Sequence, residues 1–235
     1  MPSFGTPTWD QALLAKAYYS DDSVVLLHGD CLELADLWTC ADVLVTDPPY
    51  GSGGMAKLYG RTLSAAGRGR IIASDETAEV RDAALALWAD RPVLCFGTPR
   101  MAEPPGGWDY RLVWDKREPG LNGGPWRYTH ESIFVRGDGW VRVNASSFSI
   151  ISVPSGNGSP EKADHVHAKP VALMQKLISA APPGVIADPF AGSGSTLVAA
   201  KALGRRAIGV ELEERYCEIA ARRLSQGVLD FGEGA

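Results

Sequence analysis

Long apolar runs, closely spaced cysteines and an excess of basic charge are all missing from this chain of 235 residues. No run of about 18 apolar residues exists to span a membrane. The opening stretch MPSFGTPTWDQ has neither the basic region nor the apolar core of a signal peptide, so we expect no membrane association and no secretion. The four cysteines lie far apart without a CxxC pair, which favours reduced thiols in a cytoplasmic protein.

The net charge of −5 means that no global basic field indicates a nucleic-acid partner. It does not exclude one, because a local basic patch is enough to bind phosphates. The apolar fraction of 45% and the charged fraction of 22% are typical of soluble globular proteins. The length suits one α/β domain with a sizeable core, so we predict a single domain over residues 1–235.

Short apolar runs alternate along the chain with amphipathic segments, which predicts strands alternating with helices. Helices are expected at 8–19, 32–38, 77–89, from Pro170, at 195–203 and at 213–224. Strands are expected at 23–28, 43–45, 92–97, 111–115, 131–136, 140–143, 147–153, 184–190 and 205–213. This order predicts a doubly wound, mostly parallel, Rossmann-like sheet of the seven-stranded type. Short connections make some strands antiparallel.

The stretch VLVTDPPYGSGG, at 43–54, ends an apolar strand with Asp47, Pro48, Pro49 and Tyr50. The two prolines cannot continue a central strand, because neither can donate to the ladder. They also restrict the backbone, so one carboxylate and one phenol ring are held stiffly at the carboxyl end of the strand. Ligands of open α/β sheets bind at that edge, which predicts a functional site here. The alternative is a strand stop with a turn cap and a core aromatic.

A glycine-rich loop, DPFAGSGS at 188–195, follows a second strand and opens a helix. Gly192 and Gly194 let the backbone turn sharply and approach a ligand closely. Glu211 ends the next strand, where a doubly wound fold places an acid to hold ribose hydroxyls. A dinucleotide fingerprint would have Gly or Ala where Leu197 stands, so the loop predicts a nucleoside site rather than a pyrophosphate site. The alternative is a turn that merely needs glycine.

DPPY together with DPFAGSGST resembles the S-adenosylmethionine-dependent DNA methyltransferases that methylate the exocyclic amino nitrogen of adenine or cytosine. The permuted order, with the tetrapeptide first and the glycine loop near the C-terminus, is similar to the β group of that family. HVHAKP at 165–170 resembles its H-x-x-x-K-P element, and HGDC at 28–31 resembles the strand end that contacts the adenine of the cofactor.

The resemblance implies a methyltransferase fold with permuted motif order and S-adenosylmethionine as cofactor. Lys169, just before Pro170 and a helix start, is expected to contact the carboxylate of the cofactor. No metal site is predicted, because His165 and His167 have no further ligand close in sequence. The predicted cofactor-binding residues are Asp30, Cys31, Asp47, His165, Lys169, Asp188, Phe190, Gly192, Ser193, Gly194, Ser195 and Glu211.

The chemistry at DPPY follows from the weak nucleophilicity of a base amine, whose lone pair is delocalised into the ring. The Asp47 carboxylate and the Pro48 carbonyl can accept its N–H groups and free the lone pair. Tyr50 can stack on a base that has left the duplex. The predicted catalytic residues are therefore Asp47, Pro48, Pro49 and Tyr50. Methylation of cytosine carbon 5 is disfavoured, because in that family the cysteine nucleophile follows a proline and no cysteine here does.

The segment 51–70 carries four basic residues and no acid, which predicts a mobile cationic loop that contacts DNA phosphates. The alternative is a solvated loop. Those predicted DNA-binding residues are Lys57, Arg61, Arg68 and Arg70. A small target-recognition segment is expected at about 116–164, where Glu131 and Asp115 are interpreted as strand-end charges without a role.

In the family that the chain resembles, Asp at the first motif position usually accompanies adenine and Ser usually accompanies cytosine. Asp47 therefore predicts site-specific transfer to adenine N6 in duplex DNA by base flipping, as in restriction-modification systems. The alternatives are N4 of cytosine, then RNA or protein methylation, then a cofactor-binding DNA regulator without catalysis. A homodimer is left open.

Overall fold

The computed structural model of the chain describes residues 8–50, 77–117, 128–143, 148–155 and 168–226. Nine strands of these residues form one sheet in the order β1-β2-β9-β8-β3-β4-β6-β5-β7. The strands are β1 (Ala17–Ser20), β2 (Val24–His28), β3 (Val43–Thr46), β4 (Val93–Gly97), β5 (Tyr110–Asp115), β6 (His130–Arg136), β7 (Ile150–Ser152), β8 (Ile186–Asp188) and β9 (Ala207–Glu211). The helices are α1 (Gln11–Ala15), α2 (Ala35–Trp38), α4 (Glu79–Trp88), α6 (Val171–Ser179), α7 (Ser195–Ala202) and α8 (Glu214–Ser225).

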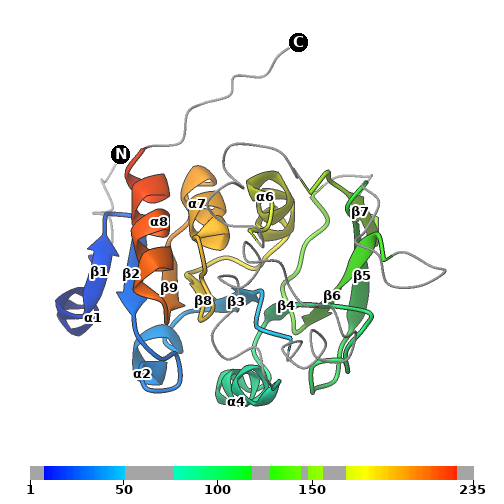
Figure 1. Ribbon diagram of the computed structural model, residues 1–235, viewed down its shortest axis with the longest axis horizontal. Helices are drawn as coiled ribbons and strands as arrows, with labels where there is room; N and C mark the ends of the chain where they lie inside the picture. Colours follow the sequence, from blue (N-terminus) through cyan, green and yellow to red (C-terminus); the bar gives the residue numbers. More distant parts are fainter. Residues whose placement is uncertain (1–7, 51–76, 118–127, 144–147, 156–167, 227–235) are drawn as a thin grey trace, which may run out of the picture.

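The sheet is doubly wound, as predicted. Strands β2, β9, β8, β3 and β4 are parallel neighbours, and β6 runs antiparallel between β4 and β5. Helices α6, α7 and α8 cover one face of the sheet, and α2 and α4 cover the other (Figure 1). None of the helices in the described ranges is long and apolar enough to cross a bilayer.

The central strands are apolar on both faces because each face is covered by helices. In β3, Val43 and Val45 belong to the core under α6 and α7, whereas Leu44 belongs to the opposite core with Trp38 and Trp88. All four residues of β3 are buried. The run without alternation, from which the sequence predicts a buried parallel strand, therefore reflects two cores that meet at the sheet.

The predicted helix at 8–19 is wrong in its second half. It ends as α1 at Ala15, and Ala17–Ser20 forms β1, which pairs antiparallel with β2. The burial of β1 alternates residue by residue, as in an edge strand, and Tyr19 packs against the core. Aromatic residues favour strands, and the open edge of β2 supplies the partner that overrides the helical spacing.

The predicted strand at 140–143 is also wrong, because these residues are not part of the sheet. The amide of Val141 instead donates to the carbonyl of Ala180, just after α6, and the side chains of Val141 and Val143 are more than half exposed. Among the described residues, β1 is the one strand of the sheet that was not expected, whereas β7 lies within the expected strand at 147–153.

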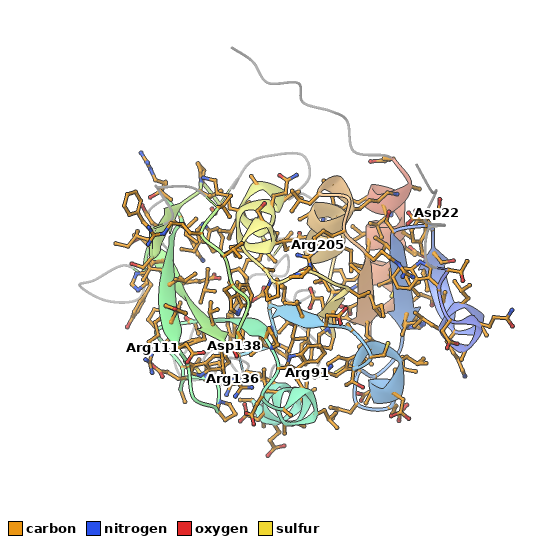
Figure 2. All side chains as sticks on the ribbon, turned by 180° about the vertical axis from the view of Figure 1, so that it is seen from behind. Asp22, Arg91, Arg111, Arg136, Asp138 and Arg205 are labelled. Carbon is orange, nitrogen blue, oxygen red and sulfur yellow. The ribbon has the colours of Figure 1, made fainter. Side chains whose placement is uncertain are left out.

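The amino ends of the parallel strands form the edge opposite to the predicted site, and arginines there support the backbone (Figure 2). Arg205, just before β9, donates to the carbonyls of Pro182 and Gly184 at 2.6 and 2.8 Å. Arg91, before β4, donates to the carbonyls of Thr39 and Ala41 at 2.8 and 2.9 Å. These two guanidinium groups therefore hold loops together at the back of the sheet.

Candidate active site

The tetrapeptide and the glycine loop meet at the carboxyl edge of the sheet. β3 and β8 are hydrogen-bonded parallel neighbours, so Asp47, which follows β3, lies beside the loop that follows β8. β9 adjoins β8 on its other side and ends at Glu211. Adjacent parallel strands thus bring together the two motifs that lie far apart in the sequence.

Both carboxylate oxygens of Asp47 accept hydrogen bonds. The hydroxyl of Tyr50 donates to Oδ1 at 2.5 Å, and the ammonium of Lys169 donates to Oδ2. Burial, followed by the charges of Asp47 and Glu131, raises the pKa of Tyr50 well above its usual value. The phenol therefore stays protonated and remains a donor. Pro48 is buried, and Pro49 is partly exposed.

Lys169 is predicted to contact the carboxylate of the cofactor, whereas the structure places its ammonium between two carboxylates of the protein. Besides Asp47, Oε2 of Glu131 lies 3.2 Å from Lys169 Nζ. The Lys169 side chain is only 9% exposed, and its ammonium lies 4.9 Å from the centre of the Phe96 ring. Burial lowers the pKa of Lys169, but the charges of Asp47 and Glu131 outweigh it and raise the pKa above the usual value.

Glu131 is the residue that sequence reasoning missed. It is the second residue of β6, and the reversed direction of β6 brings it to the same edge as the end of β4. Its Oε1 accepts a hydrogen bond from Lys116 at 2.5 Å, just beyond the end of β5. The local pattern HESIFV indicates a strand but gives no sign that the acid is buried between two lysines.

The glycine loop is shaped by its two glycines and held by α8. Gly192 and Gly194 have φ of 53° and 80°, in the left-handed region that favours glycine. A Cβ at Gly194 would also lie 2.9 Å from the Cβ of Ala220 in α8. From the same helix, Arg223 donates to the carbonyl of Ser193 at 2.7 Å and lies 3.3 Å from the hydroxyl of Ser195. Both serines are buried, and α7 begins directly after Gly194.

Leu197 departs from the dinucleotide fingerprint for a packing reason. The third fingerprint glycine serves close packing of the helix on the sheet. In this chain the close approach uses Gly209 of β9, where an added Cβ would lie 2.6 Å from Cδ1 of Leu197. The small residue thus stands on the strand and the large one on the helix.

Asp188, predicted to bind the cofactor, is 2% exposed and fully engaged by the protein. Thr46 donates to its Oδ1 at 2.8 Å and Thr196 to its Oδ2 at 2.5 Å, and the amide of Phe190 lies 3.2 Å from Oδ1. Burial raises the pKa of Asp188 to about 6, against the lowering effect of these donors. The carboxyl group therefore ties β3, β8 and α7 together. Phe190 itself is partly exposed.

Glu211 is held by the amides of the loops around it. Its Oε2 accepts from Gly192 at 2.7 Å and its Oε1 from Glu213 at 2.8 Å. Burial raises the pKa of this carboxyl group, and the two amide donors act against that effect. The amides fix the direction of the carboxylate and leave lone pairs free for hydroxyl donors.

Asp30 and Cys31 lie next to Glu211, because the amide of Gly29 donates to the carbonyl of Glu211 at 2.9 Å. Asp30 accepts from the amide of Leu32 at 2.8 Å. Cys31 is buried, and burial raises the pKa of its thiol to about 12, so it acts as an apolar wall rather than as a nucleophile.

The predicted residues His165, Lys57, Arg61, Arg68 and Arg70 lie outside the described residues. Parts of the expected recognition segment at about 116–164, namely 118–127, 144–147 and 156–164, do so as well. Within the described part, the predicted residues form two adjacent groups. Asp47, Tyr50 and Lys169 form one with Glu131, and the strand end at Asp30, the glycine loop and Glu211 form the other.

The comparisons with known proteins show the family and the fold of the chain. The DNA methylase family model matches residues 86–222, which is more than half of the chain. The Type II methyltransferase M2.LlaDCHI of Lactococcus lactis subsp. cremoris is 27% identical over 256 residues, which cover 92% of this chain and 94% of that protein.

Two solved structures show the same fold. The crystal structure of the M1.HpyAVI–SAM complex has a TM-score of 0.61 at 21% identity and covers 86% of this chain and 98% of its own. The PvuII DNA methyltransferase, described as cytosine-N4-specific, has a TM-score of 0.59 at 15% identity. The match covers 93% of this chain and 91% of that structure's chain. They confirm the predicted doubly wound fold class.

Proposed function

The chain belongs to the DNA methylase family and is a DNA methyltransferase, and we propose that it methylates adenine N6 in duplex DNA with S-adenosylmethionine as the methyl donor. One observation carries this proposal. The Asp47 carboxylate, with two hydrogen-bond donors on it, stands at the end of β3 beside the glycine loop that follows the adjacent strand β8.

The chemistry required of the protein is to make an amino nitrogen nucleophilic. When bound, S-adenosylmethionine supplies an electrophilic methyl group on a sulfonium sulfur. Asp47 accepts an N–H of the base amine, which draws the nitrogen toward tetrahedral geometry and frees its lone pair. On accepting the methyl group, the nitrogen would have one proton to lose. Asp47 is the carboxylate proposed to receive it, and the ring of Tyr50 is proposed to stack on the extruded base.

The residues of the second group fit a nucleoside. The glycine loop brings the backbone into the left-handed turn that allows close approach, and α7 begins directly behind it. The Glu211 carboxylate is aligned by two amides and can still accept from ribose hydroxyls. Asp30 and Cys31 would border the adenine, and Asp188 would act by fixing the loop. His165 is proposed at the same site by resemblance, whereas Lys169, which the resemblance also assigns to the cofactor, is held by Asp47 and Glu131.

The proposed base is adenine, because Asp stands at the first motif position. N4 of cytosine is the alternative, since a carboxylate accepts from the amino group of either base. Phosphate binding is proposed for Lys57, Arg61, Arg68 and Arg70. Replacing the last three by Ala should lower the slope of log affinity against log salt by about 0.9 for each phosphate that is no longer neutralised.

The test is transfer of a labelled methyl group from S-adenosylmethionine to unmodified duplex DNA, followed by digestion to nucleosides and mass spectrometry. N6-methyldeoxyadenosine is expected, and Asp47→Ala is the matched inactive control. Methylated deoxycytidine alone would overturn the base assignment. Transfer to structured RNA or to protein, with none to DNA, would overturn the proposed DNA substrate. Binding of S-adenosylmethionine and DNA without any methyl transfer would favour a DNA-binding regulator without catalysis.

A further inference from the structure

Four charged side chains form a continuous row at the proposed catalytic site, in the order Lys116, Glu131, Lys169 and Asp47. We propose that Glu131 is a positioning residue, which holds the ammonium of Lys169 in place against the catalytic carboxylate of Asp47. This inference rests on the proposed function, because it assigns Glu131 a part in the same methyl transfer.

The row is built from separate segments of the chain. Lys116 follows β5, Glu131 is the second residue of β6, Lys169 precedes α6 and Asp47 follows β3. Glu131 spans the two lysines, with Oε1 at 2.5 Å from Lys116 and Oε2 at 3.2 Å from Lys169. Its side chain is 13% exposed, so neither lysine–glutamate contact is an ordinary surface ion pair.

The two lysines and two carboxylates of this row balance in charge, and each charged group is stabilised by the opposite charge beside it. A buried charge without a partner is strongly unfavourable, so each lysine needs a carboxylate close by. Lys169 has two, Asp47 and Glu131, and its other close neighbours are the rings of Phe96 and Tyr50. Burial raises the pKa of Glu131, but the charges of Lys169 and Lys116 outweigh it and bring the pKa below the usual value. Glu131 therefore remains charged at neutral pH.

The two donors on Asp47 differ in how easily a base could replace them. Lys169 is an ammonium held on both sides by carboxylates, whereas the Tyr50 hydroxyl is neutral. Entry of a base amine at Oδ1 exchanges one neutral donor for another, and Oδ2 stays on Lys169. Glu131 thereby decides which oxygen of Asp47 is available and fixes the plane of the carboxylate.

Two variants separate positioning from charge balance. Glu131→Gln keeps the shape of the side chain but leaves one excess positive charge in the row. The double variant Lys116→Met with Glu131→Gln restores neutrality without restoring the hold on Lys169. We expect kcat to fall by about 10- to 100-fold in both variants, because misplacement of the catalytic group is costly. The dissociation constant for S-adenosylmethionine should change less than about threefold, since the glycine-loop group is untouched.

A second readout follows Lys169 itself and needs no DNA. In protein labelled with ¹⁵N-lysine, the ammonium signal of Lys169 should titrate at lower pH in both variants than in the parent chain. The alkaline limb of the kcat profile should shift in the same direction. Glu103→Gln, which breaks the exposed pair with Arg111 at 3.0 Å, is the control and should leave kcat, cofactor affinity and the Lys169 signal unchanged.

Parent-like kcat and an unshifted Lys169 signal in Glu131→Gln would overturn the proposal, and so would recovery of kcat in the double variant. If Glu131→Gln fails to fold, the neutral double variant tests the proposal in its place. If the parent chain transfers no methyl group to DNA, the proposed function fails, while the Lys169 titration still reports whether Glu131 holds that ammonium.

Discussion

Two aspartates, each followed by proline, stand at the ends of neighbouring parallel strands. Asp47 follows β3 and Asp188 ends β8. The side chain of Asp47 is 24% exposed and is held by a lysine and a tyrosine, whereas Asp188 is 2% exposed and is held by two threonine hydroxyls and an amide.

The difference shows that the partners of a carboxylate, more than its place in the fold, set what it can do. The Tyr50 hydroxyl on Asp47 can give way to the amino group of a base. The donors on Asp188 come from Thr46, which ends β3, and Thr196, which lies in α7, so releasing them would loosen the site. One aspartate is therefore suited to chemistry and the other to holding the glycine loop against the sheet.

The largest effect should come from removing the carboxylate of Asp47, which is proposed to be catalytic. Asp47→Ala should lower kcat for methyl transfer by about 10³-fold, in the range for loss of a preorganised electrostatic group. Its affinity for S-adenosylmethionine, measured by calorimetry, should stay within a few-fold, because the cofactor is proposed to be held by the glycine-loop group. Asp36→Ala, at an exposed position in α2, is the control. Loss of cofactor binding together with activity would show that the two groups are not separate.

Asp188 should instead affect how the free energy of unfolding depends on pH. Its pKa is raised to about 6 in the folded chain, against 3.8 for the unfolded group. The folded state therefore binds the proton more tightly, and this stabilisation, present at acidic pH, is lost as pH rises through about 6. A pKa difference of about two units between the folded and unfolded states corresponds to about 3 kcal/mol in the free energy of unfolding.

The measurement is the free energy of unfolding by urea, for the parent chain and Asp188→Asn, between about pH 4 and pH 7. The difference between the two should change by about 3 kcal/mol, with the variant gaining on the parent chain as pH rises. A difference that stays constant over this range would mean that Asp188 ionises normally and that its burial has no such consequence.

The sequence predicted most of the fold because the decisive signals are local. The apolar runs of β2 and β3, and the glycines before α7, specify structure through their own neighbours. The contact of Glu131 with Lys169 depends on how β6 pairs with β4, which no local spacing encodes. Likewise, Ala17–Ser20 forms a strand because β2 offers an open edge.

The role of each residue in the candidate site is harder to predict from the sequence than which residues lie near one another. The resemblance places Asp188 at the cofactor, and the structure shows both its oxygens occupied by protein donors. It likewise assigns Lys169 to the cofactor, whereas the ammonium of Lys169 is bonded to Asp47. A motif identifies which residues gather at a strand end, but burial and partners, which come from other strands, decide how each is used.

Glu211 is intermediate between the two aspartates in how far the protein occupies its carboxylate. Two backbone amides align the carboxylate but leave lone pairs free to accept from ribose hydroxyls. Glu211→Ala should weaken S-adenosylmethionine binding by about 2 kcal/mol, the range for a charge-assisted hydrogen bond. Calorimetry would measure this, with Glu218→Ala on the exposed face of α8 as the control. Unchanged affinity would place the ribose elsewhere.

The smallest effect should come from Thr46→Val, which tests whether the two aspartates are independent. Thr46 directly precedes Asp47, yet its hydroxyl donates to Asp188. Valine keeps the buried shape and removes one hydrogen bond, so the free energy of unfolding should fall by about 1 kcal/mol at pH 7. The pKa of Asp188 should rise further, because a donor to its charged form is removed. Thr196→Val should behave alike, as it removes the other hydroxyl. Because neither hydroxyl touches Asp47, kcat should remain within a few-fold, and a large loss in Thr46→Val alone would show that Asp188 and Asp47 act as one unit.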